Sequence, residues 1–195
     1  MSYISLSGNI AVGKSTVLYE LEERGYEVVC ENLGQRFLSL LDAYNKSPQE
    51  AIHLQKYINE YRWTDARLSC VGEDDGLYIH ERSMIDDMIF TTYMICKGEI
   101  SQKEGQEFLE LATHRLTIDP PTKVIYLYAD PDITFERMLE RGRPEESSQT
   151  LLNIAELEQA HQVLLPIICG ELGIELVEVN WSFFGEIQTI LDLIE

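Results

Sequence analysis

The sequence has few positive charges. Its 195 residues include 34 aspartates and glutamates against 15 lysines and arginines, giving a formal net charge of −19 at pH 7. Such a chain is a poor match for a polyanion, so we predict that it binds neither nucleic acid nor an anionic membrane. Any phosphate site would have to gather the scarce cations locally, which makes their positions informative.

Features typical of secreted, metal-binding and membrane proteins are also missing. The four cysteines are far apart, and no histidine pairs with a cysteine or another histidine at metal-ligand spacing. No stretch approaches the roughly 18 apolar residues that cross a bilayer, and the N-terminus MSYISLSG lacks a cationic start and a long apolar run. These absences predict a reduced, cytoplasmic protein.

Short apolar runs alternate with helical patterns along the chain. The predicted strands are residues 3–7, 27–30, 77–80, 123–128 and 174–179, and the predicted helices include residues 48–68, 83–96, 102–113, 132–140, 151–170 and 183–194. Because a parallel crossover needs a dozen or more residues, this alternation predicts an α/β fold with a five-stranded parallel sheet and helices on both faces. With no repeat and no Gly/Ser-rich linker, the chain is predicted to form one domain over residues 1–195.

The stretch GNIAVGKST, residues 8–16, matches the phosphate-binding pattern G-x-x-x-x-G-K-[ST] between the first predicted strand and the first helix. Its glycines let backbone N–H groups close around phosphate oxygens, Lys14 can neutralise terminal phosphates, and Ser15 can ligate Mg²⁺. The alternative is an ordinary glycine turn. The predicted phosphate-binding residues are Gly8, Asn9, Ile10, Ala11, Val12, Gly13, Lys14, Ser15 and Thr16.

Charged residues end the second and third predicted strands. Glu31 and Glu81 should lie at the same carboxyl edge of the sheet as the phosphate loop. Glu31 could accept the proton of an acceptor hydroxyl, Glu81 could support Mg²⁺, and Arg82 could hold Glu31 and the incoming oxygen. A solvated acid and a surface salt bridge are the alternatives.

Three arginines cluster near residue 140. Arg137, Arg141 and Arg143 lie within seven positions, before the break at Pro144. Clustered guanidinium groups leaving a helix predict a lid over the transferring phosphoryl group, at about residues 137–149. Pairing with neighbouring glutamates is the alternative.

Taken together, these stretches resemble the deoxynucleoside kinase family over residues 2 to about 165. GNIAVGKST is similar to the family's GNIGSGKST, the ERS at residues 81–83 matches its ERS motif, and RGRPEE at residues 141–146 matches its lid. The resemblance implies a P-loop kinase fold with ATP as phosphate donor, Mg²⁺ as cofactor and a deoxynucleoside 5′-hydroxyl as acceptor. It also implies nucleotide salvage by a homodimer, formed through helices that residues 83–113 could supply.

The resemblance assigns roles to individual residues. It makes Glu31 the base for the 5′-hydroxyl with Arg82 as its partner, and places Glu81 at the metal. Arg137, Arg141 and Arg143 match lid arginines that contact donor phosphates. The predicted nucleoside-binding residues are Glu31, Tyr44, Gln55, Arg62, Arg82, Asp87 and Glu146. Among them, Tyr44 and Glu146 match the pair that binds the sugar 3′-hydroxyl, and Gln55 matches the glutamine that pairs with the base.

Base preference follows from two of these matches. Gln55 and Arg62 are seven residues apart and therefore share a helix face. Arg62 and Asp87 match the arginine and aspartate of the family's deoxycytidine and purine kinases. An aspartate held by arginine accepts hydrogen bonds, which favours a base with an exocyclic amino group. The alternative for Asp87, and the expectation for Asp86, is a first-turn acid facing the helix dipole.

One segment departs from the family pattern. The family follows its glutamate with Pro-Val and then a tryptophan near the base, whereas this chain reads ENLGQRF at residues 31–37. Phe37 is the predicted substitute, while Trp63 is predicted to lie in the core or at the rim.

Two other functions stay open at this point. A nucleoside monophosphate kinase of the thymidylate kinase type shares the loop, the acid-arginine motif and the lid. It should need further cations for the acceptor phosphate, and near Glu31 the sequence offers only Arg36. A non-catalytic nucleotide-binding module is the second alternative, which the intact set of charged residues disfavours.

Overall fold

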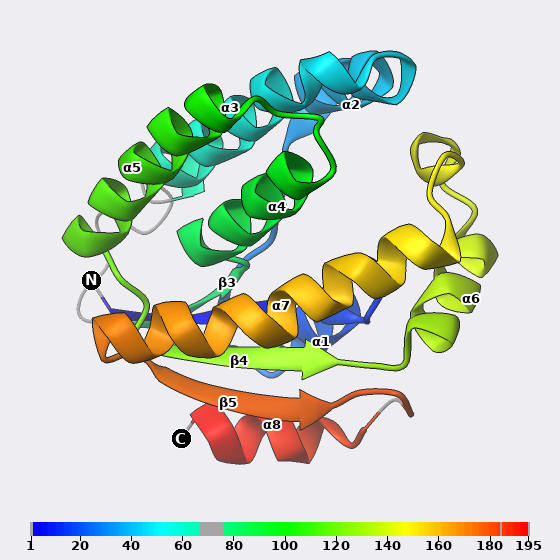
Figure 1. Ribbon diagram of the computed structural model, residues 1–195. Coiled ribbons are helices and arrows are strands. Elements are labelled where there is room, and N and C mark those ends of the chain that lie inside the picture. The colour runs from blue at the N-terminus through cyan, green and yellow to red at the C-terminus, as the bar shows by residue number, and fades with distance from the viewer. Residues whose placement is uncertain (1, 67–75, 184, 195) are drawn as a thin grey trace.

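A five-stranded parallel sheet forms the centre of the computed structural model, which describes residues 2–66, 76–183 and 185–194 (Figure 1). The strands are β1 (Ser2–Gly8), β2 (Glu27–Val29), β3 (Leu77–Glu81), β4 (Lys123–Tyr128) and β5 (Glu175–Asn180). Their order is β2-β3-β1-β4-β5, and every neighbouring pair is parallel. The central strand β1 therefore ends beside the ends of β3 and β4, in the register Leu6–Glu81 and Gly8–Leu127.

Helices cover both faces of the sheet. The helices α1 (Lys14–Glu23) and α8 (Ile187–Ile194) pack on one face, and α4 (Met84–Cys96) and α7 (Leu151–Leu172) pack on the other (Figure 1). A strand covered on both faces must place apolar side chains on alternate faces, and β4 does so. Ile125 and Leu127 join the first core, whereas Val124 and Tyr126 join the second.

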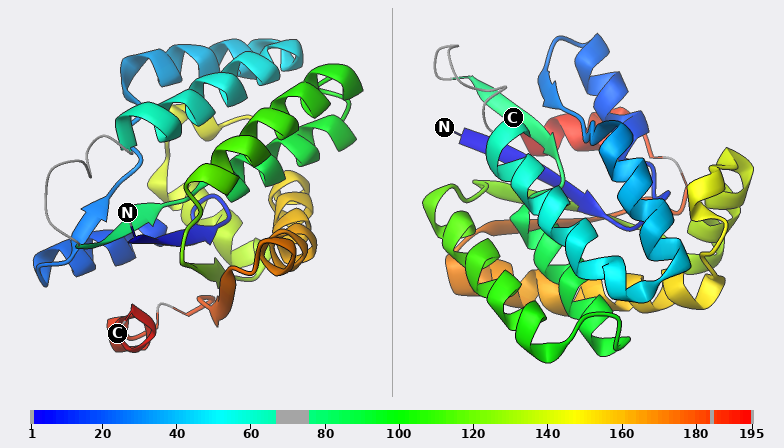
Figure 2. Two further views of the ribbon diagram at one scale, coloured as in Figure 1. Left: turned by 90° about the vertical axis from the view of Figure 1, so that its left-hand side faces the viewer. Right: turned by 90° about the horizontal axis from the view of Figure 1, so that it is seen from above.

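A further layer of helices lies beyond α4. It comprises α2 (Gly34–Lys46), α3 (Ala51–Tyr61) and α5 (Gln102–Ile118), and Figure 2 shows this layer on the α4 side of the sheet. A 3₁₀ turn (Pro48–Glu50) precedes α3, and a π-helical turn (Arg62–Ala66) follows it. The predicted lid corresponds to the end of α6 (Pro131–Arg141) with a 3₁₀ turn at Pro144–Glu146.

The predicted fold class is confirmed, and the strands fall within two residues of the predicted positions. The helix predicted over residues 48–68 is wrong as one element, because it divides into a 3₁₀ turn, α3 and a π turn; residues 67 and 68 lie outside the described ranges. The helix predicted over 183–194 begins at Ile187.

Helix α2 was not predicted. None of its side chains is fully buried, and its apolar residues Phe37, Leu38 and Leu41 line a cavity instead of the core. Among the described helices, none is long and apolar enough to cross a membrane.

Candidate active site

The phosphate loop connects β1 to α1. Gly8 has φ 146°, and a Cβ atom there would lie 2.5 Å from the carbonyl oxygen of Leu127. Only glycine fits this close approach of two backbones. Ala11 has φ 59°, a left-handed conformation that is uncommon for a residue with a side chain. The loop is therefore held in the compact shape that turns backbone N–H groups towards an anion.

Lys14 is folded back over this loop. Its Nζ atom donates hydrogen bonds to the carbonyl oxygens of Gly8 (2.8 Å) and Asn9 (2.7 Å). Burial, and secondarily the nearby Arg82 guanidinium, lower the pKa of Lys14 to about 7. An anion that binds in the loop would offset both causes, so the site favours a polyphosphate.

The predicted metal residues meet beside the loop. The Ser15 hydroxyl donates to Glu81 Oε1 at 3.1 Å, and Glu81 Oε2 accepts the backbone N–H of Glu31 at 3.1 Å. A hydroxyl and a carboxylate are oxygen ligands of the kind that Mg²⁺ prefers. The residue chemistry therefore fits a magnesium ion held next to the phosphates.

Glu31 follows β2 and is clamped by two arginines. Arg82 Nη1 donates to Glu31 Oε2 at 2.9 Å, and Arg62 Nη2 donates to Glu31 Oε1. Burial alone would raise the pKa of Glu31, but Arg62, Arg82 and then Lys14 hold it below its ordinary value. The carboxylate is therefore ionised at neutral pH and can accept a proton.

Arg82 owes its position to the sharp end of β3. Its φ of 64° is left-handed, its backbone N–H donates to Leu6 O at 3.0 Å, and its guanidinium lies 5.2 Å from the centre of the Phe90 ring. Asp86 then caps α4, accepting the Ser83 N–H at 2.9 Å and the Ser7 hydroxyl at 2.7 Å. The expected first-turn role of Asp86 is confirmed as a capping box.

Arg62 contacts residues on both the predicted phosphate side and the predicted nucleoside side of the site. Besides Glu31, it donates through Nη1 to Glu81 O (3.0 Å) and through Nε to Asp87 Oδ1 (2.8 Å). Asp87 Oδ2 accepts a hydrogen bond from Asn59 Nδ2 at 3.0 Å. Burial raises the pKa of Asp87, while Arg62 and Asn59 oppose the rise. The predicted pairing of Arg62 with Asp87 is present.

A single cavity of about 960 Å³ contains both sides of the site. Its nucleoside end is lined by apolar side chains, among them Phe37, Leu54, Ile58, Phe90 and Met94. Gln55 also lines it, is only 2% exposed, and has an Oε1 atom with no hydrogen-bond partner among the described residues. An unpartnered buried amide oxygen is costly, and this one is open to a hydrogen-bond donor within the cavity.

The two residues predicted to bind the sugar, Tyr44 and Glu146, have different partners. Tyr44 and Glu146 both line the cavity. However, the Tyr44 hydroxyl donates to Glu99 Oε2 at 2.9 Å, whereas Glu146 accepts from Arg141 Nη2 at 2.6 and 2.8 Å. In this conformation Glu146 therefore binds Arg141 within the lid segment rather than Tyr44.

The three lid arginines all line the cavity but make different contacts. Arg137 donates to backbone carbonyls of Val12 (3.0 Å), Trp181 (3.1 Å) and Ser182 (2.9 Å), which ties the phosphate loop to the segment after β5. Arg141 pairs with Glu146, and the Arg143 side chain is 58% exposed. Arg143 is therefore the most exposed of the three, whereas Arg137 and Arg141 are held by contacts within the protein.

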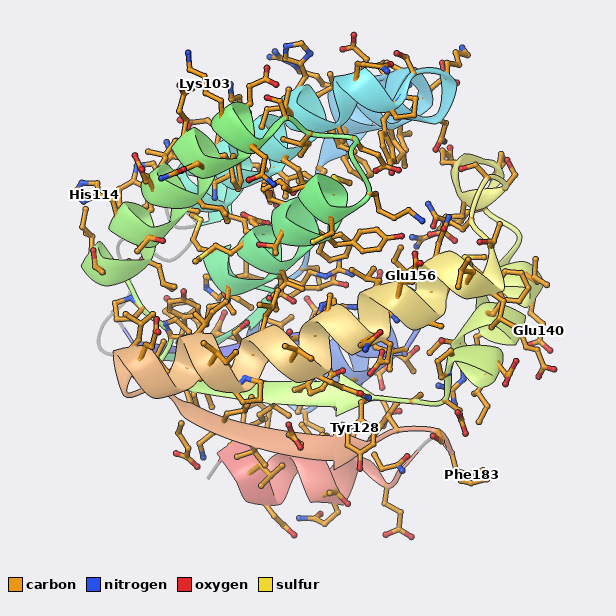
Figure 3. All side chains as sticks on the ribbon, viewed as in Figure 1. Lys103, His114, Tyr128, Glu140, Glu156 and Phe183 are labelled. Atoms are coloured by element: carbon orange, nitrogen blue, oxygen red, sulfur yellow. The ribbon has the colours of Figure 1, made fainter. Side chains whose placement is uncertain are left out.

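The lid is docked on α2. Asn45 Nδ2 donates to Glu145 O at 2.8 Å, and the Ser148 hydroxyl donates to Asn45 Oδ1 at 2.9 Å. Exposed charges elsewhere do not contribute to the site. Lys103 and His114, for example, point to the outside of α5, away from α4 (Figure 3).

Among the residues that were not predicted are Asn59 and Glu99, which donate to Asp87 and accept from Tyr44, respectively. Asn59 is buried and lies four residues after Gln55 and three before Arg62, so a polar stripe at helical spacing could have revealed it. Glu99 follows Gly98 in the turn between α4 and α5, and nothing in the sequence separates it from the other acids. Trp63 packs against the α4–α7 core and stacks on Arg115, 5.4 Å from the ring centre.

The geometry defines the class of protein first. A phosphate loop at the end of the central strand, an acid-arginine pair ending the adjacent strand and an arginine-bearing lid are the parts of a P-loop kinase. Residues 4–187 match the family model described as deoxynucleoside kinase. The chain therefore belongs to the deoxynucleoside kinase family.

Individual relatives agree with this assignment. The chain is 33% identical to the "Probable deoxycytidine kinase" of Fowlpox virus (strain NVSL) over 82% of this chain and 69% of the relative. It is 26% identical to mitochondrial deoxyguanosine kinase of Xenopus laevis, over 88% and 76% of the two chains. The fold matches deoxyadenosine kinase of M. mycoides with bound dATP, with a TM-score of 0.81 at 19% identity, covering 99% of this chain and 98% of that one.

Family membership decides between the functions that the sequence left open. The chain is a nucleotide-binding kinase that acts on deoxynucleosides, so neither a thymidylate-kinase-type enzyme nor a non-catalytic module describes it.

Proposed function

We propose that this kinase transfers the terminal phosphate of ATP to the 5′-hydroxyl of deoxyadenosine, deoxyguanosine or deoxycytidine, with Mg²⁺ as cofactor. The observation that carries the base preference is the Arg62–Asp87 contact of 2.8 Å in the cavity wall. Two of the relatives are a probable deoxycytidine kinase and a deoxyguanosine kinase, and the bases cytosine and guanine both carry an exocyclic amino group.

The phosphate end supplies the chemistry. Glu31 accepts the 5′-hydroxyl proton as the new P–O bond forms, while Arg82 keeps the carboxylate in place. Lys14 and the loop N–H groups bind the donor phosphates, and Ser15 and Glu81 would hold Mg²⁺. The metal, when bound, neutralises charge on the phosphates. Arg137, Arg141 and Arg143 close the donor side and exclude water.

The nucleoside end selects the base. Asp87 accepts hydrogen bonds, so it can take one from an amino group, whereas the carbonyl that thymine has there would meet a second acceptor. Gln55 offers an unpartnered oxygen to a further donor on the base edge. Because mismatched buried polar groups cost on the order of 1–3 kcal/mol, thymidine should be strongly disfavoured.

A homodimer is part of the proposal, and the exposed apolar side chains favour α7 over residues 83–113 as its interface. Among the described residues of 83–113, Leu111 is the one large apolar side chain that is strongly exposed. Helix α7 instead exposes Leu151, Leu152, Val163, Ile167 and Leu172. Light scattering on the purified protein would show twice the 22.4 kDa chain mass if the dimer forms.

The test is a transfer assay with ATP as donor and single deoxynucleosides as acceptors, with and without a chelator. The expected result is a deoxynucleoside monophosphate and ADP that disappear when Mg²⁺ is removed. Phosphorylation of deoxyadenosine monophosphate with none of deoxyadenosine, deoxyguanosine or deoxycytidine would contradict the proposal.

A further inference from the structure

The nucleoside end of the cavity holds a carboxylate that the proposed mechanism does not use. Glu99 lies in the turn between α4 and α5 and lines the same cavity as Glu31 and Asp87. Its Oε2 atom accepts a hydrogen bond from the Tyr44 hydroxyl at 2.9 Å. Glu146, which the family resemblance pairs with that tyrosine, is engaged by Arg141. The tyrosine hydroxyl is therefore controlled from the α4–α5 turn.

We propose that Glu99 is a specificity-determining residue, which fixes the Tyr44 hydroxyl so that it receives the 3′-hydroxyl of the deoxynucleoside sugar. This inference rests on the proposed function and names the part of the substrate that Glu99 controls. Glu99 acts on the sugar through Tyr44, whose hydroxyl donates to its Oε2 atom.

The direction of the Tyr44–Glu99 hydrogen bond determines which ligand group can hydrogen-bond to Tyr44. A phenol has one O–H, and Tyr44 donates it in the hydrogen bond to Glu99, so towards a ligand the phenol oxygen can only accept. Burial, and then the charge of Glu99, raise the pKa of Tyr44, so the phenol keeps its proton at neutral pH. The matching ligand group is a hydroxyl that donates, whereas a sugar with only hydrogen at C3′ leaves the tyrosine oxygen without a partner.

Glu99 is held on a rigid support. Its backbone N–H donates to Met94 O at 2.9 Å, and the Gly98 N–H donates to Ile95 O at 3.0 Å. Ile100, the next residue, is buried. A carboxylate fixed in this way can hold a tyrosine in one rotamer, which is what selective recognition of one hydroxyl requires.

The charges around Glu99 leave it free for this role. Among the described lysines and arginines, none forms an ion pair with Glu99, and Lys97, two residues earlier, pairs with Glu156 at 2.9 Å. On the other side, Asn45 ties the segment after Tyr44 to the lid at Glu145. The tyrosine is thus positioned between a fixed carboxylate and the lid.

The experiment compares a deoxynucleoside with the 2′,3′-dideoxynucleoside of the same base, which lacks the 3′-hydroxyl. For each, kcat/KM is measured with wild type, Glu99→Gln, Tyr44→Phe and the double variant. Glu107→Gln is the matched control, because Glu107 is an exposed acid on the neighbouring helix α5. Thermal melting confirms that each variant is folded.

We expect the wild type to favour the deoxynucleoside by about tenfold or more, as for one hydrogen bond to a substrate hydroxyl. Glu99→Gln should reduce this ratio roughly threefold to tenfold, since glutamine keeps only a neutral hydrogen bond to the tyrosine. The double variant should lose no more than Tyr44→Phe alone, and Glu107→Gln should retain the full ratio.

The two proposals fail in different ways. An active wild type whose ratio is unchanged in Glu99→Gln, or a variant that loses activity on both substrates equally, would overturn the role of Glu99 alone. A folded wild type that phosphorylates no deoxynucleoside would overturn the proposed function, and with it this inference.

Discussion

The two ends of the cavity are built in different ways. The phosphate end consists of one continuous loop, residues 8–16, and the ends of the neighbouring strands β2 and β3. The nucleoside end is assembled from α2, α3, α4, the turn after α4 and the lid. A triphosphate is a common group that a local motif can bind, whereas a particular base and sugar must be recognised by side chains brought together by tertiary packing.

Arg62 contacts both ends of the cavity. One guanidinium contacts Glu31 and Glu81 O at the phosphate end and Asp87 at the nucleoside end. It stands at the start of a π-helical turn, a feature that is rare in helices and frequent at functional sites. A change at one end should therefore affect rate, and a change at the other should affect choice of base. The following predictions separate the two.

The largest effect is expected at Glu31. Replacing Glu31 by Gln removes the proton acceptor but keeps the side chain's shape, so kcat should fall about a thousandfold. The dissociation constant of the deoxynucleoside, measured by calorimetry, should change little. Glu27→Gln, on strand β2 just before Glu31, is the exposed control. Turnover retained in the Glu31 variant would show that another group accepts the proton.

A smaller loss of rate is expected at Lys14. Lys14→Met removes a charge aimed at the donor phosphates, and kcat/KM for ATP should fall roughly a hundredfold to a thousandfold.

Without ligand, the Lys14→Met variant should be more stable to unfolding than the wild type. The folded-state pKa of Lys14 lies below its unfolded value, so its contribution to stability is unfavourable below about pH 7 and improves as pH rises from there towards about 10.4. Thermal melting at pH 7 checks this, with Lys103→Met as the exposed control.

The change at the nucleoside end should alter selectivity more than rate. In Asp87→Asn, the amide can present a donor where the carboxylate could only accept. The ratio of kcat/KM for deoxyadenosine or deoxycytidine over that for thymidine should drop about tenfold to a hundredfold. Asp192→Asn on α8, across the sheet, should keep the wild-type ratio. An unchanged ratio in Asp87→Asn would remove this residue from base recognition.

The smallest expected effect is a proton taken up with the nucleotide. With a pKa of about 7, Lys14 is mostly neutral at pH 8 without ligand, and bound phosphates should protonate it. Calorimetry of ATP binding in two buffers of different ionisation enthalpy should show uptake approaching one proton at pH 8 and little at pH 6. Equal heats in both buffers at pH 8 would contradict the lowered pKa.

The same contrast explains what the sequence could predict. The strands, the loop at residues 8–16 and the strand-end acids follow from periodicity and motif, because strand ends of a parallel sheet converge at one edge. The base-end pair Arg62 and Asp87 came from family resemblance, since 25 residues separate them and no local rule brings them together. Helix α2 was missed because its apolar face lines a cavity, and Glu99 because only the packing of α2 against the α4–α5 turn brings it to Tyr44.

The central claim is that a base with an exocyclic amino group is selected in the cavity that carries out phosphoryl transfer. The most direct measurement is a competition in which ATP, Mg²⁺ and equimolar deoxyadenosine, deoxyguanosine, deoxycytidine and thymidine are incubated with the wild type and the monophosphates are separated. We predict that one or more of the first three monophosphates forms, with thymidine monophosphate at least tenfold lower. Thymidine monophosphate as the main product would contradict the account.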